Sequence, residues 1–173
     1  MNMLMIIVLI SGVDLFFVEK TSDLMVKVSP SIKTKQVTIC YSFRTTTWDT
    51  VGTIKEDNRF SVVIHPPESL KVIGVYCLYD NNAIDDNGGQ LYLFEVSTSP
   101  RFISRISLDH LSTMLAQARK KIVSKTHIDE AVFLLDYVRS MIGVIPYITE
   151  TNQEFEIHTL QSELNTIYQL LSP

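Results

Sequence analysis

The sequence predicts a single α+β domain, in which a largely antiparallel sheet over residues ~3–97 precedes a helical hairpin and a C-terminal amphipathic helix. Two observations carry this prediction. Apolar residues alternate with a period of two through most of the first 100 residues, as in strands, and recur every three or four residues after Pro100, as in helices. We therefore expect residues 1–100 to form the β-rich part and residues 101–173 the helical part of one domain.

The length and composition also indicate one globular body. A chain of about 100 to 200 residues typically forms one domain around one core, and this chain has 173 residues. Apolar residues make up 46% of it and charged residues 20%, which are ordinary values for a globular protein. This composition excludes a disordered or fibrous chain.

Seven segments have the apolar pattern and the length of strands. The last two are apolar on both faces, so we expect them at the middle of a layered structure. Ser11-Gly12 lies between the first two and predicts that they form a hairpin. The expected strands cover residues 3–10, 13–18, 23–29, 37–44, 59–65, 71–79 and 90–97.

The apolar run at residues 3–10 and the two cysteines bear on where the protein works. The run is about half as long as a membrane span, and no Lys or Arg precedes Lys20, whereas a signal peptide usually begins with basic residues. We therefore expect a strand, with a weak secretion signal as the alternative. Cys40 and Cys77 lie inside strand patterns, which predicts buried thiols rather than a disulfide or a metal pair. A cytoplasmic location follows from both expectations.

Residues 80–89 join the two doubly apolar strands and contain three Asp and three Asn. Such a loop invites a calcium interpretation. Counted from Asp80, however, the fifth position is Ile84 and the twelfth is Leu91, where a calcium-binding EF-hand loop needs an oxygen ligand and a bidentate Glu. We therefore expect no metal here but a mobile, exposed tip, which is a secondary candidate for contact with a partner.

Three helices are expected after Pro100, each with an identifiable start. Ser107 can cap a helix that runs to about Lys125, and Thr126 can cap a second one that ends at Gly143. The third helix opens with Thr151-Asn152-Gln153-Glu154, a Thr-x-x-Glu capping box. The first two helices would form a hairpin.

The third helix carries a narrow apolar stripe whose spacings of 3, 4, 3 and 4 residues match the a/d positions of a coiled coil. This stripe is the candidate site for binding a protein partner or for self-association. The alternative is a terminal helix packed on its own domain. It is favoured because the stripe spans only two heptads, fewer than the three or four that indicate a coiled coil. The stripe consists of Ile157, Leu160, Leu164, Ile167 and Leu171.

Charge is unevenly distributed along the chain, whose net charge is −4. Residues 101–125 contain six basic groups and one acidic group, whereas residues 126–173 contain one basic and seven acidic groups. The basic block could bind the phosphates of an anionic membrane or a nucleic acid. It lacks the interleaved aromatic residues that stack on bases, so a solvated helix face is the favoured alternative. The block consists of Arg101, Arg105, Arg119, Lys120, Lys121 and Lys125.

No catalytic or cofactor motif is present in the sequence. Glycine-rich phosphate loops, the nucleophile elbow GxSxG and the zinc motif HExxH are all missing, and the four histidines have no metal-ligand spacing. Cys40 and His65 could meet across strands as a nucleophile and a base, but a packed thiol beside a strand-end histidine is the simpler interpretation. The sequence therefore indicates no cofactor, no metal and no small-molecule substrate.

These observations favour a non-enzymatic protein-interaction or assembly domain, such as an adaptor, a scaffold or a viral structural protein. It would act through its C-terminal helices. The alternative is a matrix-type protein that binds an anionic membrane or nucleic acid through residues 101–125. A cryptic hydrolase is the third hypothesis.

Overall fold

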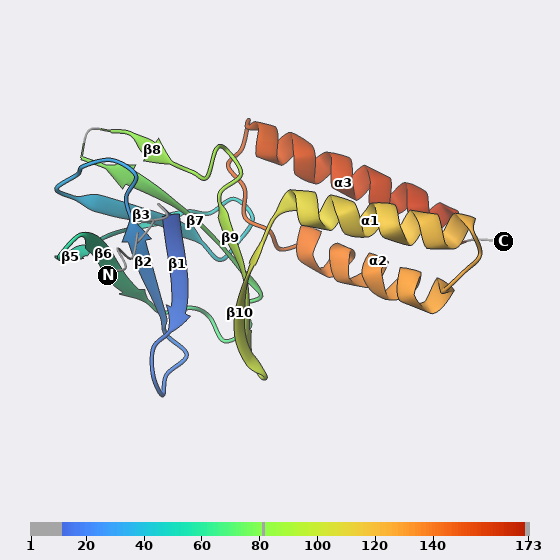
Figure 1. Cartoon of the computed structure of the whole chain (residues 1–173), viewed down its shortest axis with the longest axis horizontal. Coiled ribbons are helices and arrows are strands. Elements are labelled where there is room, and N and C mark those ends of the chain that lie inside the picture. The colour runs from blue at the N-terminus through green and yellow to red at the C-terminus, as the bar shows by residue number, and fades with distance from the viewer. Residues whose placement is uncertain (1–11, 81, 172–173) are drawn as a thin grey trace, which may run out of the picture.

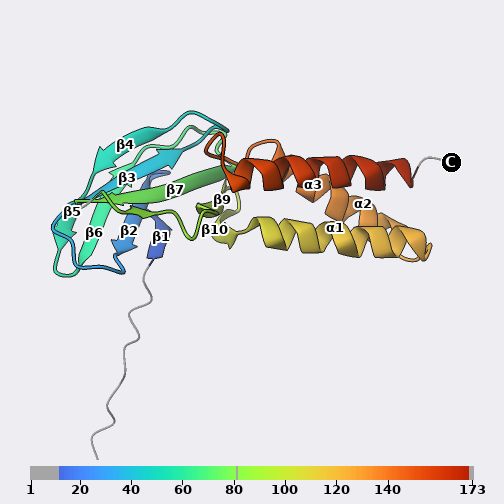
Figure 2. The same cartoon turned by 90° about the horizontal axis from the view of Figure 1, so that it is seen from above.

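The computed structural model describes residues 12–80 and 82–171, and these residues form two antiparallel sheets and three helices (Figure 1). The expected α+β fold with a C-terminal helix is thereby confirmed. Figure 2 shows the two sheets at one end of the molecule and the three helices side by side at the other. The strand expected at residues 3–10, and with it the predicted hairpin, lies outside the described residues.

The first sheet has the strand order β1-β2-β6-β5 and the second has the order β10-β9-β7-β3-β4, with the short β8 paired to β7. Neighbouring strands are antiparallel throughout. The first sheet comprises β1 (Gly12–Phe17), β2 (Leu24–Ser29), β5 (Ile54–Glu56) and β6 (Arg59–Ile64). The second comprises β3 (Val37–Ser42), β4 (Asp49–Gly52), β7 (Val72–Tyr79), β8 (Ile84–Asp85), β9 (Tyr92–Thr98) and β10 (Arg101–Ile106).

A first core fills the space between the two sheets. In β2 the alternation is complete: Leu24, Val26 and Val28 are fully buried, while the residues between them are only partly buried. They pack with buried residues of the second sheet, among them Ile39 and Val75. The residues that give the sequence its period of two are thus those that face the space between the two sheets of a sandwich.

The chain passes from one sheet to the other at Thr53, between β4 and β5. Thr53 donates from its backbone N–H and from its Oγ1 to the carbonyl of Val37, at 3.2 and 2.7 Å. Neither strand was expected from the sequence, because both lie largely exposed and carry no apolar alternation. They form because β3 and β6 offer them free edges.

Residues 101–106 form strand β10, which corrects the expectation that everything after Pro100 is helical. The strand pairs with β9 over its whole length, from Arg101 opposite Thr98 to Ile106 opposite Leu93. Its outward side chains are exposed, so its sequence shows no clean period of two. Pairing with an existing edge, rather than local pattern, determines this strand.

Strands β7 and β9 are buried on both faces, as the sequence predicted, and lie side by side. Ile73 and Phe94 face the core between the sheets. Val72 and Leu93 face a second core, which they share with the three helices. One pair of strands therefore belongs to both cores.

The helices are α1 (Leu108–Val123), α2 (Ile128–Ile142) and α3 (Asn152–Gln169). Ser107 accepts from the N–H of His110, and Thr151 accepts from the N–H of Glu154, so the expected caps of α1 and α3 are confirmed. The expected cap at Thr126 is wrong. The N-cap of α2 is His127, which adopts the left-handed conformation with φ 50° and caps nothing with its side chain.

The segment between α2 and α3 fastens the helices to the second sheet. Tyr147 donates its N–H to Thr45 at 2.8 Å, and its carbonyl accepts from the indole Nε1 of Trp48 at 3.2 Å. Pro146 lies directly on Gly74 of β7, where the Cβ of any other residue would stand 2.9 Å from the proline Cβ. The close approach requires a residue without a side chain at position 74.

Candidate binding sites

The apolar stripe of α3 is buried inside the helical bundle, which corrects its assignment as a partner-binding seam. Four of its five residues are almost completely buried, and Leu171 packs against them partly buried. The stripe faces α1 and α2, whose own apolar faces complete the core. The narrow period reflects packing within a three-helix bundle, which uses the same geometry as a coiled coil. The buried residues are Ile157, Leu160, Leu164 and Ile167.

Two phenylalanines stand on the outer surface of the helices. Phe133 of α2 is 71% exposed and Phe155 of α3 is 73% exposed. Phe155 lies outside the apolar stripe of its helix, and that position is the sequence signal by which it could have been found. Leaving a Phe side chain in water forgoes about 2 kcal/mol of burial free energy, so such residues mark candidate contact surfaces.

A groove of about 280 Å³ lies between the first turn of α1 and residues 155–163 of α3, and Phe155 forms one wall of it. Three carboxylates line this groove, from Asp109 of α1 and from Glu156 and Glu163 of α3. No Lys or Arg is among the lining residues. We call this site the acidic groove. An exposed aromatic ring beside several negative charges suits a ligand that is both apolar and basic.

The basic block of residues 101–125 is divided between two parts of the molecule. Arg101 and Arg105 lie on β10 and contact β1 of the opposite sheet and the residues that follow it. Arg101 donates through Nη2 to the carbonyls of Val18 and Thr21, at 2.6 and 2.7 Å, and its guanidinium lies 4.3 Å from the ring centroid of Phe17. These two arginines therefore stabilise the packing of the two sheets against each other.

The other four basic residues of the block lie at the far end of α1. Lys121 forms an ion pair with Glu130 of α2 at 2.6 Å, so one of these four charges is paired within the helices. The first of the four, Arg119, is about 16 Å along the helix from Leu108. The six basic residues therefore do not form one anion-binding surface. Only Arg119, Lys120 and Lys125, whose side chains are exposed, remain as candidates for binding an anion.

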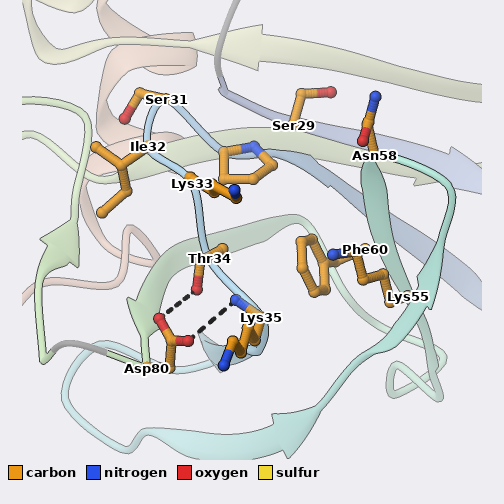
Figure 3. A pocket seen from close by; sticks show the side chains of 11 residues that line it. Ser29, Ser31, Ile32, Lys33, Thr34, Lys35, Lys55, Asn58, Phe60 and Asp80 are labelled. Carbon is orange, nitrogen blue, oxygen red and sulfur yellow. Dashed lines mark hydrogen bonds between the residues drawn. The ribbon is translucent and has the colours of Figure 1, made fainter.

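A pocket of about 560 Å³ lies at the end of the sandwich remote from the helices (Figure 3). It is formed by the β2–β3 connection, which crosses from one sheet to the other, by the β5–β6 hairpin and by Asp80 at the end of β7. We call it the lysine pocket because Lys33, Lys35 and Lys55 line it. The sequence did not predict it, since its residues come from three separate segments and only Lys33-Thr34-Lys35 gives a weak local hint.

The one carboxylate that lines the lysine pocket, that of Asp80, is already hydrogen-bonded to other groups of the protein. Asp80 accepts from Thr34 Oγ1 at 2.6 Å and from the N–H of Lys35 at 3.0 Å, as the dashed lines in Figure 3 show. These two hydrogen bonds hold the pKa of the Asp80 carboxyl below its usual range. Asp80 thus fixes the β2–β3 connection against β7 and keeps Lys35 in place.

In the loop at residues 80–89, of which the structure describes residues 80 and 82–89, most residues are exposed as expected, but Asp85 ties the loop back onto the sandwich. Its Asp85 carboxylate accepts from Tyr79 at 2.6 Å and from Tyr92 at 2.7 Å. Burial, followed by the Asp85 carboxylate, raises the pKa of both phenols. Over residues 12–80 and 82–171, no group of three or more His, Cys, Asp or Glu is placed to hold a metal ion.

The candidate nucleophile and base are not brought together. Cys40 is buried in β3 of the second sheet, whereas His65 follows β6 of the first sheet and binds Asp23 through Nδ1 at 2.7 Å. The expected buried thiols are confirmed, since Cys40 and Cys77 are both free and buried. Burial raises the pKa of both thiols, so neither is activated as a thiolate.

Comparison with the models of known protein families finds no match to this chain, and comparison with curated proteins finds none either. In the described part of the chain, no helix combines the length and hydrophobicity needed to cross a membrane.

Proposed function

We propose that this chain is a non-enzymatic, cytoplasmic protein-interaction domain, of the adaptor, scaffold or structural kind, that acts through the outer face of its C-terminal helices. The buried stripe of α3 cannot supply the contact surface, because its residues build the bundle. The acidic groove replaces it. The observation that carries the proposal is Phe155, 73% exposed beside Asp109, Glu156 and Glu163.

The groove defines the chemistry of the partner. Three carboxylates with no lining cation favour a segment that carries Lys or Arg, and they would repel an acidic one. The ring of Phe155 favours an apolar side chain in the same segment, because exposed aromatic residues are frequent anchors at interfaces. We therefore infer a partner segment in which basic and apolar residues are interleaved.

The raised thiol pKa values and the separation of Cys40 from His65 support a non-enzymatic role over a hydrolase. A nucleophilic cysteine needs a lowered pKa and a base within hydrogen-bonding reach. The matrix-type alternative loses support because Arg101 and Arg105 bind backbone carbonyls of the protein itself.

A display library of short random peptides, panned against the full chain, tests this proposal. We expect enrichment of peptides with net positive charge and at least one large apolar residue. Phe155→Ala should weaken the binding of the enriched peptides about tenfold, which corresponds to about 1.4 kcal/mol. Charge reversal by Glu156→Lys with Glu163→Lys should abolish it.

Phe133→Ala is the matched control, since Phe133 is as exposed as Phe155 but lies on another helix. This variant should bind the enriched peptides like the wild type. The proposal would be overturned if no basic peptides were enriched, or if Phe155→Ala bound them as tightly as Phe133→Ala does.

A further inference from the structure

The lysine pocket has the dimensions of a ligand site and lies far from the acidic groove. Its volume of about 560 Å³ falls within the range of about 300 to 1,000 Å³ that is usual for small-molecule pockets. The β2–β3 connection and the β5–β6 hairpin, which line it, lie at the end of the sandwich opposite the helices (Figures 1 and 2). A ligand held there would touch both sheets at once.

Positive charge dominates this pocket, although the whole chain has a net charge of −4. Three lysines and one aspartate line it, and the carboxylate of Asp80 is engaged by Thr34 and by the N–H of Lys35. Within the part of the chain that the structure describes, neither Lys33 nor Lys55 forms an ion pair. Two ammonium groups therefore remain available to an anion.

The pocket also has an apolar component. The ring of Phe60, 2% exposed, forms the floor between the loop that carries Lys33 and the strand that carries Lys55 (Figure 3), and the Lys55 ammonium is 5.4 Å from its centroid. Ile32, 40% exposed, contributes an apolar side chain from the β2–β3 connection. A ligand with a flat or apolar group could therefore rest against carbon while its charged end met the lysines.

Neutral hydrogen-bonding groups complete the lining. Asn58, in the β5–β6 turn, offers an amide, and Ser29 at the end of β2 and Ser31 in the β2–β3 connection offer hydroxyls. Phosphate has several oxygens that accept such hydrogen bonds in addition to its ionic contacts. A simple carboxylate or halide would leave most of these donors unused.

We propose that the lysine pocket binds a small, soluble phosphate monoester with an aromatic or other flat apolar group. The phosphate lies between the ammonium groups of Lys33 and Lys55, and the apolar group contacts Ile32, with the buried ring of Phe60 as the floor of the pocket. Lysine binds phosphate as a flexible point charge, so the pocket accepts the anion without a fixed fork geometry. This site is independent of the acidic groove and of the function proposed for it.

Titration of the isotope-labelled full chain with phenyl phosphate, followed by the NMR shifts of its backbone amides, tests the proposal. We expect saturable shifts centred on residues 29–35 and 55–58. Inorganic phosphate should shift the same amides but bind several-fold more weakly, because it lacks the ring. Phenol, which lacks the charge, should produce no saturable shift.

Lys33→Gln with Lys55→Gln should weaken phenyl phosphate binding at least tenfold. Lys120→Gln with Lys125→Gln removes the same charge from the far end of the helical bundle and should leave binding unchanged, and the amide spectra verify that both variants are folded. Equal binding by the two double variants, or shifts centred on residues 119–125, would overturn the proposal. The absence of saturable binding at millimolar phenyl phosphate would also overturn it.

Discussion

Arg105 donates a hydrogen bond from its Nη2 to the carbonyl of Val13 at 2.8 Å, and this contact joins the edge strand of one sheet to the edge strand of the other. The same guanidinium lies over the rings of Tyr92 and Phe94, at 5.2 and 5.6 Å from their centroids. At the opposite side of the sandwich the chain itself joins the sheets, at Thr53. The sandwich is thus fastened along both of its long sides.

Replacing Arg105 with Ala should therefore lower the free energy of unfolding. The change removes a charge-assisted hydrogen bond and two cation–π contacts, and we expect a loss of about 1.5 kcal/mol. Chemical denaturation followed by circular dichroism measures it. Arg119→Ala is the control, because this exposed arginine on α1 should cost less than about 0.5 kcal/mol. Similar losses for both variants would contradict a specific role for Arg105.

Gly74→Ala should loosen the helices from the second sheet. A Cβ at this position would stand 2.9 Å from Pro146 Cβ and 3.4 Å from the ring of Trp48, so the segment between α2 and α3 must move. We expect a loss of about 2 kcal/mol. Trp48 is the single tryptophan of the chain, and its fluorescence should report the displacement.

Gly52→Ala is the matched control for this substitution. Gly52 lies in strand β4, and a Cβ there would meet no atom within 4 Å. Its unfolding free energy should change by less than about 0.5 kcal/mol. An unchanged tryptophan spectrum and an unchanged stability in Gly74→Ala would show that the contact with Pro146 is not needed.

Leu164→Ala should destabilise the fold without changing the molar mass of the protein in solution. Leu164 is 3% exposed within the core of the helical bundle, and removing such a side chain costs about 3 kcal/mol. Thermal denaturation and light scattering together test this expectation. Leu170→Ala, at a residue 48% exposed on the same chain segment, should cost far less. A lower molar mass with full stability would instead restore the stripe as an association seam.

Stability should fall as the pH rises above 10. Burial raises the pKa of Tyr76 to about 12, and burial together with the Glu95 carboxylate, 2.8 Å away, raises the pKa of Tyr137 to about 12. The unfolded phenol has a pKa of about 10. Because the folded values are raised, their stabilising contribution is complete below pH 10 and is lost between pH 10 and 12.

Denaturation midpoints between pH 8 and 12, with tyrosinate absorbance recorded in parallel, check this prediction. Tyr137→Phe should make the midpoint less dependent on pH in that window, since it removes one of the shifted phenols. Titration of all seven tyrosines near pH 10 in a chain that stays folded would contradict the prediction.

The parts of the fold that the sequence predicted are those that local pattern determines. Strand β2 alternates cleanly because one face packs on the core, and β7 and β9 are apolar on both faces because each lies between two cores. The caps at Ser107 and Thr151 depend only on residues three positions away. Such features need no knowledge of distant contacts.

The rest depends on partners that are distant in the sequence. Strand β10 forms because β9 has a free edge, and its exposed side chains leave no periodic signal. The lysine pocket joins residues near 30, 55 and 80, and nothing in the spacing of these segments brings them together before the sheets stack. The apolar stripe of α3 was visible in the sequence. The sequence did not show whether the stripe faces a partner or the other helices of its own bundle, because both kinds of packing share one period.

The double burial of β7 and β9 has a consequence for how the protein denatures. Val72 and Leu93 contribute to the helical core, and their neighbours Ile73 and Phe94 contribute to the core between the sheets. Unfolding of the helical bundle would expose one face of β7 and β9 to water. It would thereby weaken the hydrogen-bonded pairing of these two strands, whose other face packs in the core between the sheets. The two cores are therefore energetically coupled, and the chain should lose both in a single cooperative transition rather than one after the other.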